Sequence, residues 1–101
     1  MKKKEKVVYI VGAITSDPYY FEKFKKAEGK LRDIGYERII NPTCLPDNLP
    51  YNSYAPISIA FVNVCDMVFI LKNHKDSIGA QAEIAYAKMS GKEIVYEEFG
   101  L

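Results

Sequence analysis

Residues 67–87 read MVFILKNHKDSIGAQAEIAYA, a succession that predicts a strand, a polar loop and a helix. The run from Met67 to Leu71 is apolar throughout, as is typical of a strand covered on both faces of a parallel sheet. Ser77 is a favoured helix N-cap residue, and Gly91 marks the expected end of the helix that Ser77 opens. Because a helix start offers unpaired N–H groups and a positive dipole end, this stretch predicts an anion site at the edge of a sheet.

Further strands and helices are predicted on both sides of this unit. The expected strands span residues 7–11, 36–40, 66–71 and 93–96. The other expected helices run from Pro18 to Ile34, with Asp17 as N-cap and Gly35 as the stop, and from 54 to 64. Since a helix separates each pair of consecutive strands, the strands must run parallel. Right-handed crossovers then predict an α/β fold, a flavodoxin-like or Rossmann-like three-layer sandwich with a four-stranded sheet in the order 2-1-3-4.

Apolar spacing predicts which face of each helix is buried. The expected stripes are Phe21, Phe24, Leu31 and Ile34 in the first helix, and Ile78, Ala82, Ala85 and Met89 in the last. The last stripe would leave Gly79, Glu83 and Tyr86 together on a neighbouring face. Gly29 is expected to mark a close contact, and Pro56 is expected in the first turn of its helix. The middle helix is apolar all round, which predicts burial on more than one side and hence a homo-oligomer.

Length and composition limit the classes of protein to consider. The 101 residues suit one domain, 1–101, in which residues 1–6 form a basic leader. A net charge of +1 gives no long-range attraction to a nucleic acid polymer or an anionic membrane. No apolar run reaches the ~20 residues of a membrane span, and none resembles a signal peptide. Cys44 and Cys65 form no zinc motif and no disulfide framework, so a cytoplasmic protein without metal or cofactor is expected.

Two loops should meet where ligands bind in such sheets, beyond the carboxyl ends of the first and third strands. They are residues 12–17 and 72–77. Gly12 either permits a ligand to approach closely or only makes the turn. Asp17 is either a helix cap or a ligand, and the hydroxyl of Tyr9 needs a partner that the crevice could supply. Ser77 caps its helix and could also hydrogen-bond a phosphate, whereas the single histidine, His74, is read as a loop residue.

Four segments together resemble the nucleoside 2-deoxyribosyltransferase superfamily, and most closely a small phage and bacterial branch of it. They are YIVGAIT at residues 9–15, INP at 40–42, CDMVFIL at 65–71 and SIGAQAEIAYA at 77–87, followed by Gly91-Lys92. The resemblance covers Val7 to Tyr96. The serine–glycine–glutamate spacing after the third strand is its most specific part, because the first-strand motif alone is weak.

The resemblance implies a site and a reaction. Glu83 matches a glutamate that attacks the anomeric carbon of a 2-deoxyribonucleoside and forms a covalent glycosyl-enzyme. Ser77 stands where the nucleotide hydrolases carry a serine that contacts the 5'-phosphate. Tyr9, Gly12 and Gly79 would line the sugar and phosphate pocket, and Asn41 would contact the base. Ser58 departs from the pattern, since the superfamily usually carries an aspartate there that helps to protonate the leaving base.

Two functions follow as hypotheses. The first is cleavage or transfer of the N-glycosidic bond of a 2'-deoxynucleoside 5'-monophosphate, with Glu83 as nucleophile. The second is a non-catalytic module that binds a nucleotide or nucleoside and lost the acid at Ser58. A flavodoxin-like signalling domain is the weakest alternative, because the third strand ends in Leu71-Lys72 without an acceptor aspartate. On its own chemistry, Glu83 is also compatible with an ordinary solvated helix glutamate.

Overall fold

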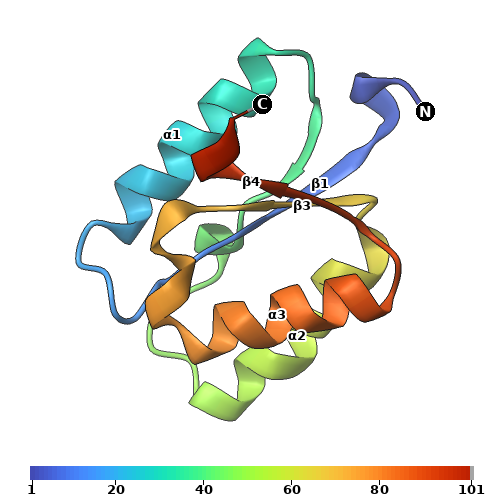
Figure 1. The fold of residues 1–101 in the computed structure, drawn as a ribbon. Coiled ribbons are helices and arrows are strands. Elements are labelled where there is room, and N and C mark those ends of the chain that lie inside the picture. Colours follow the sequence, from blue (N-terminus) through green and yellow to red (C-terminus); the bar gives the residue numbers. More distant parts are fainter. Residues whose placement is uncertain (101) are drawn as a thin grey trace.

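Four parallel strands form the middle layer of the protein, whose computed structural model describes residues 1–100 (Figure 1). They are β1 (Val7–Val11), β2 (Arg38–Ile40), β3 (Met67–Ile70) and β4 (Glu93–Tyr96). Their order in the sheet is β2-β1-β3-β4, which confirms the prediction. β1 lies between two partners, with Val8 beside Ile39 of β2 and beside Met67 of β3. The switch point of the sheet therefore falls between β1 and β3.

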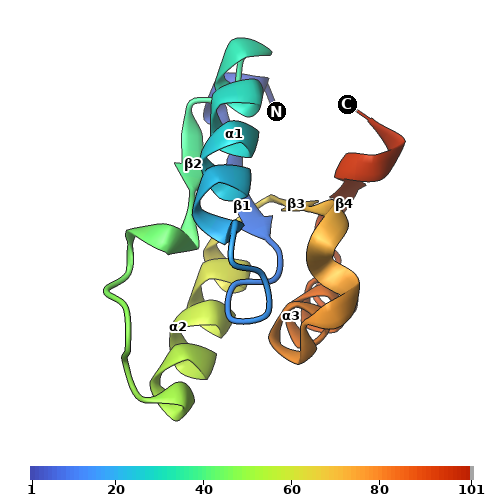
Figure 2. The same cartoon turned by 90° about the vertical axis from the view of Figure 1, so that its left-hand side faces the viewer.

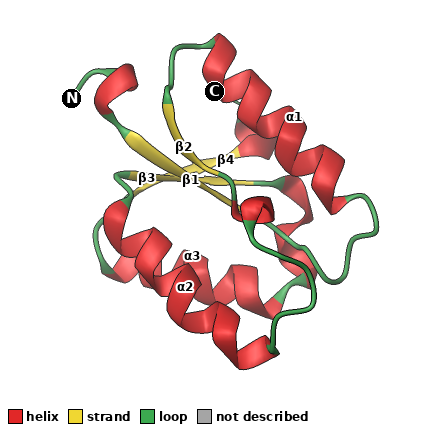
Figure 3. Cartoon of the chain, turned by 180° about the vertical axis from the view of Figure 1, so that it is seen from behind, coloured by secondary structure: helices red, strands yellow, loops and turns green. Residues whose placement is uncertain are grey.

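Three helices cover the two faces of the sheet. They are α1 (Tyr20–Asp33), α2 (Tyr51–Val64) and α3 (Ile78–Met89). α1 lies on one face, and α2 and α3 lie together on the other (Figures 2 and 3). The fold is thus a flavodoxin-like three-layer α/β sandwich, as expected from the alternation of strands and helices. Among residues 1–100, no helix combines the length and the apolar character that crossing a bilayer requires.

Each strand contributes to two separate cores because successive side chains point to opposite faces. On the α1 side, Val8 and Ile10 pack with Phe24 and Leu31, all fully buried. On the other side, Tyr9 and Val11 belong to a second cluster. The helix residues of that second cluster are Val62, Ala80, Ile84 and Ala87. The alternation places the Tyr9 side chain on the face that α3 covers.

The start of α1 differs from the prediction. The helix begins at Tyr20, and Asp17 is not its N-cap. Instead, Asp17 Oδ1 accepts a hydrogen bond from the Tyr19 N–H (2.8 Å), which closes a turn ahead of the helix. Phe21 is half exposed, so it does not belong to the buried stripe. Gly29 also differs from the prediction, since a Cβ built there would meet nothing within 4 Å.

α2 and α3 also differ from the prediction. α2 begins at Tyr51 and not at residue 54, so Pro56 is the sixth residue of the helix and lies beyond its first turn. In α3 the expected stripe is wrong: Ile78 and Met89 are 85% and 84% exposed, and Ala82 and Ala85 are exposed too. The residues that α3 buries are Ala80, Ile84 and Ala87. Small residues lie on every side of this helix, so packing against the sheet, and not an apolar stripe, sets its rotation.

Candidate functional site

A cavity of about 570 Å³ lies beyond the carboxyl ends of β1 and β3. Its walls come from five parts of the chain. They are the loop after β1, Tyr20 of α1, the segment between β2 and α2, Tyr54 and Ser58 of α2, and the first turns of α3 together with the turn before it. Gly12 and Glu83 both line it, as expected. A volume of a few hundred Å³ at the switch point of a parallel sheet is typical of a small-molecule site.

Glu83 and Tyr9 form a hydrogen-bonded pair at this cavity. The Tyr9 hydroxyl donates to Glu83 Oε2, and the Tyr9 side chain is only 2% exposed. The Tyr9 ring also packs at a tilt against Phe61 of α2, with a centroid separation of 5.3 Å. A buried phenol needs such a partner, and the pairing fixes the carboxylate against the middle of the sheet.

Burial changes the acid–base behaviour of this pair. Removal from water raises the pKa of Glu83 from about 4.5 to about 7, although hydrogen bonds from Tyr9 and Ser58 to the carboxylate lower it. Burial, together with the nearby carboxylate, raises the pKa of Tyr9, so the phenol stays protonated and remains a donor. Glu83 therefore titrates near neutral pH, as a carboxyl group at a reactive site often does.

The N-terminus of α3 forms the next part of the wall. Ser77 is the N-cap of α3, and its Oγ accepts a hydrogen bond from the Ala80 N–H (3.1 Å). The N–H groups of Ile78 and Gly79 have no hydrogen-bond partner within residues 1–100. A Cβ built on Gly79 would meet only Ser77 Oγ, at 3.9 Å, so the space beside these donors is open. Asp76 also lines the cavity, and no lysine or arginine does so within the described residues.

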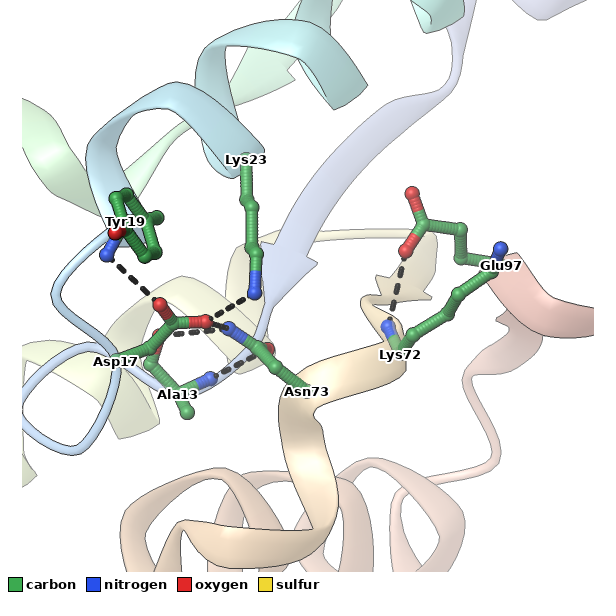
Figure 4. Close-up of polar contacts among 7 residues, drawn as sticks. All are labelled: Ala13, Asp17, Tyr19, Lys23, Lys72, Asn73 and Glu97. Atoms are coloured by element: carbon green, nitrogen blue, oxygen red, sulfur yellow. Dashed lines mark hydrogen bonds and ion pairs between the residues drawn. The ribbon is translucent and has the colours of Figure 1, made fainter.

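A clasp of polar contacts joins the loop after β1 to the turn after β3 (Figure 4). Asn73 Oδ1 accepts from the Ala13 N–H (3.0 Å), and Asn73 Nδ2 donates to the Ala13 carbonyl (3.2 Å) and to Asp17 Oδ2 (2.7 Å). Lys23 Nζ of α1 forms an ion pair with the same Asp17 oxygen at 2.6 Å. The backbone of Lys72 donates to Glu97 Oε1 (2.9 Å), which ties the same turn to the segment after β4.

The clasp explains two sequence features. A Cβ on Gly12 would come within 2.9 Å of Asn73 Oδ1 and 3.0 Å of Leu71, so this position excludes a side chain because the turn after β3 approaches it. Hydrogen bonds from Asn73, Lys23 and the Tyr19 N–H lower the pKa of Asp17 to about 2. Asp17 is therefore a structural anion that holds the loop closed.

The structure brings together most of the residues predicted for the site, but not all. The cavity is lined by Gly12, Ser58, Ser77, Gly79 and Glu83, and the Tyr9 hydroxyl donates a hydrogen bond to Glu83 from β1. Asp17 lies instead in a smaller neighbouring cavity. Asn41 does not line the cavity: its Oδ1 accepts from the backbone N–H and the hydroxyl of Thr43, and its Nδ2 donates to Glu28. Asn41 caps the turn Pro42–Cys44, so its side chain is engaged outside the cavity, and its contact with a base stays a prediction.

Several residues of the site are absent from the prediction. Asn73 looks like any polar loop residue in the sequence, and only the folded chain places it opposite Ala13. Tyr20, Asp47 and Tyr54 also line the cavity, where their contacts join segments up to 27 residues apart. His74 lies in the short turn Lys72–Asp76 between β3 and α3, where it is buried and its Nδ1 lies 2.8 Å from the Leu71 carbonyl.

Comparisons with other proteins give one match. The model of a family described as a domain of unknown function, DUF4406, matches residues 6–96. No curated protein and no solved structure matches the chain. The matched range contains every residue of the cavity and all four strands. The chain therefore belongs to the DUF4406 family.

Proposed function

We propose that the protein cleaves or transfers the N-glycosidic bond of a 2'-deoxynucleoside 5'-monophosphate. The observation that carries this proposal is the position of Glu83. Its carboxyl group is largely withdrawn from water, bonded to Tyr9, and placed on the cavity that also contains the free N–H groups of α3. A carboxylate held in this way suits attack on an anomeric carbon, while the helix N-terminus suits a phosphate.

The reaction balances with residues of this chain and water. One oxygen of Glu83 bonds to the anomeric carbon as the bond from that carbon to the base nitrogen breaks. The base leaves with the electron pair and takes a proton from solvent. Water then attacks the same carbon and loses a proton, which releases 2-deoxyribose 5-phosphate and restores the carboxylate. A second base in place of water gives a new nucleotide, and the reaction is then a transfer.

Phosphate recognition follows from the start of α3. The N–H groups of Ile78 and Gly79 and the hydroxyl of Ser77 can donate three hydrogen bonds to one anion. The Ala80 N–H is not available as well, because Ser77 Oγ already accepts it. Donors at a helix N-terminus bind anions without a nearby cation. Asp76 opposes this binding from the same end of the cavity, so the N–H groups must outweigh its charge.

The sequence resemblance supports the same reading. The segments around Tyr9 and between Ser77 and Ala87 resemble the nucleoside 2-deoxyribosyltransferase superfamily, and the DUF4406 match spans both. The structure places the residues of these segments at one cavity. We propose on these two grounds that the chain is related to that superfamily.

A non-catalytic nucleotide-binding module is the second candidate, and Ser58 is the observation that favours it. Ser58 lines the cavity and hydrogen-bonds Glu83, in the position where an acid would assist the leaving base. A serine hydroxyl cannot deliver a proton as a carboxylic acid does. The module would keep the anion site and the Tyr9–Glu83 pair but release no base.

One experiment separates these candidates. The purified protein and its Glu83→Gln variant are incubated with each of the four deoxynucleoside 5'-monophosphates, and free base is measured by chromatography. Calorimetric titration measures binding in parallel. Base release that the substitution abolishes supports the enzyme. Binding without release selects the module, and the absence of binding to all four nucleotides overturns both.

A further inference from the structure

The segment between β2 and α2 lines the end of the cavity that adjoins the smaller cavity, whose described lining residues include none from α3. Leu45, Asp47 and Leu49 line it, together with Tyr20 of α1 and Tyr54 of α2. Tyr20, Asp47 and Tyr54 also line the smaller cavity next to it, so they stand where the two cavities meet. This end therefore combines aromatic rings with one carboxylate.

Tyrosine hydroxyls hydrogen-bond the stretch from Pro46 to Leu49 within this segment. Tyr54 donates to the Pro46 carbonyl (3.2 Å) and accepts from the Leu49 N–H (3.1 Å). Tyr20 donates to Asp47 Oδ1 at 3.2 Å. Asp47 thus lies between two backbone positions that Tyr54 fixes, and its own carboxylate is oriented by a third contact. A binding group needs support of this kind to act selectively.

The Asp47 carboxylate has unused hydrogen-bonding capacity. An ionised carboxylate only accepts hydrogen bonds, and it has about four lone-pair positions. Among the side chains that the structure describes, which leave out that of Tyr51, Asp47 has one hydrogen-bond donor, Tyr20, and no ion pair. It can therefore accept further N–H groups from a molecule in the cavity.

Electrostatics gives the orientation of a nucleotide in the cavity. The N–H groups of Ile78 and Gly79 attract a phosphate at one end. A carboxylate lies at each end, Asp76 beside these N–H groups and Asp47 at the other, so only the end with the free N–H groups offsets the repulsion of a phosphate, and Asp47 attracts N–H donors. The aromatic rings of Tyr20 and Tyr54 offer faces on which a base can stack. The base of a bound nucleotide is then the part that lies beside Asp47.

We infer that Asp47 is the residue that reads the base, by accepting hydrogen bonds from N–H donors on its pairing edge. This inference rests on the proposed nucleotide substrate. A carboxylate matches an edge with two adjacent donors, as guanine has at N1 and the 2-amino group. Hypoxanthine offers one of these donors, and adenine offers one donor beside an acceptor that the carboxylate repels. The expected order of affinity is dGMP, then dIMP, then dAMP.

The test uses the full-length chain with Glu83→Gln, so that no turnover occurs during a titration. The dissociation constants of dGMP, dIMP and dAMP are measured for this protein and after adding Asp47→Asn. An asparagine amide presents one donor and one acceptor, so in the place of the carboxylate it matches the adenine edge and loses one of the two bonds to guanine N1 and the 2-amino group. Asp76→Asn is the matched control, because it removes a carboxylate from the phosphate end of the same cavity.

We expect dGMP to bind on the order of tenfold more tightly than dAMP, with dIMP between them. Asp47→Asn should abolish or reverse this order, whereas Asp76→Asn should change all three affinities by the same factor. Thermal unfolding of each variant confirms that it is folded. Equal affinity for dGMP and dAMP, or an unchanged ratio in Asp47→Asn, overturns the role of Asp47 and leaves the proposed function standing. If none of the three nucleotides binds, the proposed function fails as well.

Discussion

The Tyr9 hydroxyl in the middle of β1 donates a hydrogen bond to the Glu83 carboxylate in the second turn of α3. The two residues are 74 positions apart and meet because Tyr9 points to the face of the sheet that α3 covers. The contact joins the central strand to the helix whose N-terminus faces the cavity. The chemistry of the site therefore depends on a contact through the second core.

Glu83 should reduce stability at neutral pH. Its pKa is about 7 in the folded protein and ordinarily about 4.5, so the folded state binds the proton more tightly and stability falls as pH rises between these values. In Glu83→Gln this loss is absent. The free energy of unfolding is measured in urea for both proteins, and the parent value is subtracted from the variant value. This difference should be about 3 kcal/mol larger at pH 8 than at pH 4.5. A difference that does not change with pH would contradict the raised pKa.

Catalysis should depend on the ionised form of Glu83. Only the carboxylate can attack the anomeric carbon, so kcat/KM for base release should rise about tenfold per pH unit below pH 7 and level off above it. The second ionisation of the substrate phosphate, near pH 6, adds a further change of slope to the plot of kcat/KM against pH at lower pH. Initial rates between pH 5 and pH 9 test this. A rate that falls steadily from pH 6 to pH 8 would show that the protonated group is the active form.

Ser77→Asp should remove the preference for a monophosphate. The parent should bind a deoxynucleoside monophosphate roughly a hundredfold more tightly than the nucleoside, since two or three charge-assisted contacts are worth about 2–3 kcal/mol. Aspartate still caps α3 but repels the phosphate, so the unfolding free energy should hardly change. Ser77→Thr keeps both the cap and the hydroxyl and is the control. Calorimetric titration of the nucleoside and the monophosphate measures the preference. Equal affinity of the parent for the two ligands would contradict the phosphate site.

Asn73→Ala should destabilise the fold through the clasp. The substitution removes three hydrogen bonds of the Asn73 side chain, those to the Ala13 N–H, to the Ala13 carbonyl and to Asp17. Groups left unsatisfied in this way cost about 1–3 kcal/mol, which urea unfolding can resolve. Asn52→Ala replaces an exposed asparagine and is the matched control. Equal unfolding free energies for the two variants would show that the clasp adds nothing to stability.

We also propose that the protein is a homo-oligomer. Ile59 and Val64 of α2 are 37% and 61% exposed, and Ala55, Pro56 and Ala60 are exposed beside them on a helix without a charged residue. An apolar helix surface of this kind is expected to pack against another surface. Light scattering at micromolar concentration should give at least the mass of a dimer. Ile59→Glu should shift the mass toward that of one chain, and a monomer in the parent would refute the proposal.

The sheet could be predicted from the sequence because its strands are short apolar runs between clear breaks. The run Val7–Val11 ends at Gly12 and the run Met67–Leu71 ends at Lys72, so the positions of the two loops at the sheet edge could be predicted directly. Glu83, Ser77 and Gly12 could be placed at one cavity for the same reason. Parallel strands bring the ends of distant segments to one edge.

The remaining parts depend on packing that the sequence pattern does not encode. α3 carries alanine at positions 80, 82, 85 and 87, and its sides look alike until the sheet selects Ala80 and Ala87 for burial. Asp17 is not the predicted cap because α1 begins only at Tyr20, and the contact of the Asp17 carboxylate with Asn73 spans 56 positions that a local pattern does not connect. The pair of Tyr20 and Asp47 likewise joins residues 27 positions apart.

The central claim is that Glu83 forms the covalent bond to the sugar, and intact-protein mass spectrometry tests it most directly. Samples of the parent and of Glu83→Gln are quenched in acid during incubation with a deoxynucleoside 5'-monophosphate, and free base is measured in the same samples. The parent should gain the mass of one 2-deoxyribose 5-phosphate unit, which digestion of the same samples should assign to the peptide that contains Glu83, and the variant should show neither the adduct nor free base. Release of base by Glu83→Gln at the rate of the parent would contradict the account.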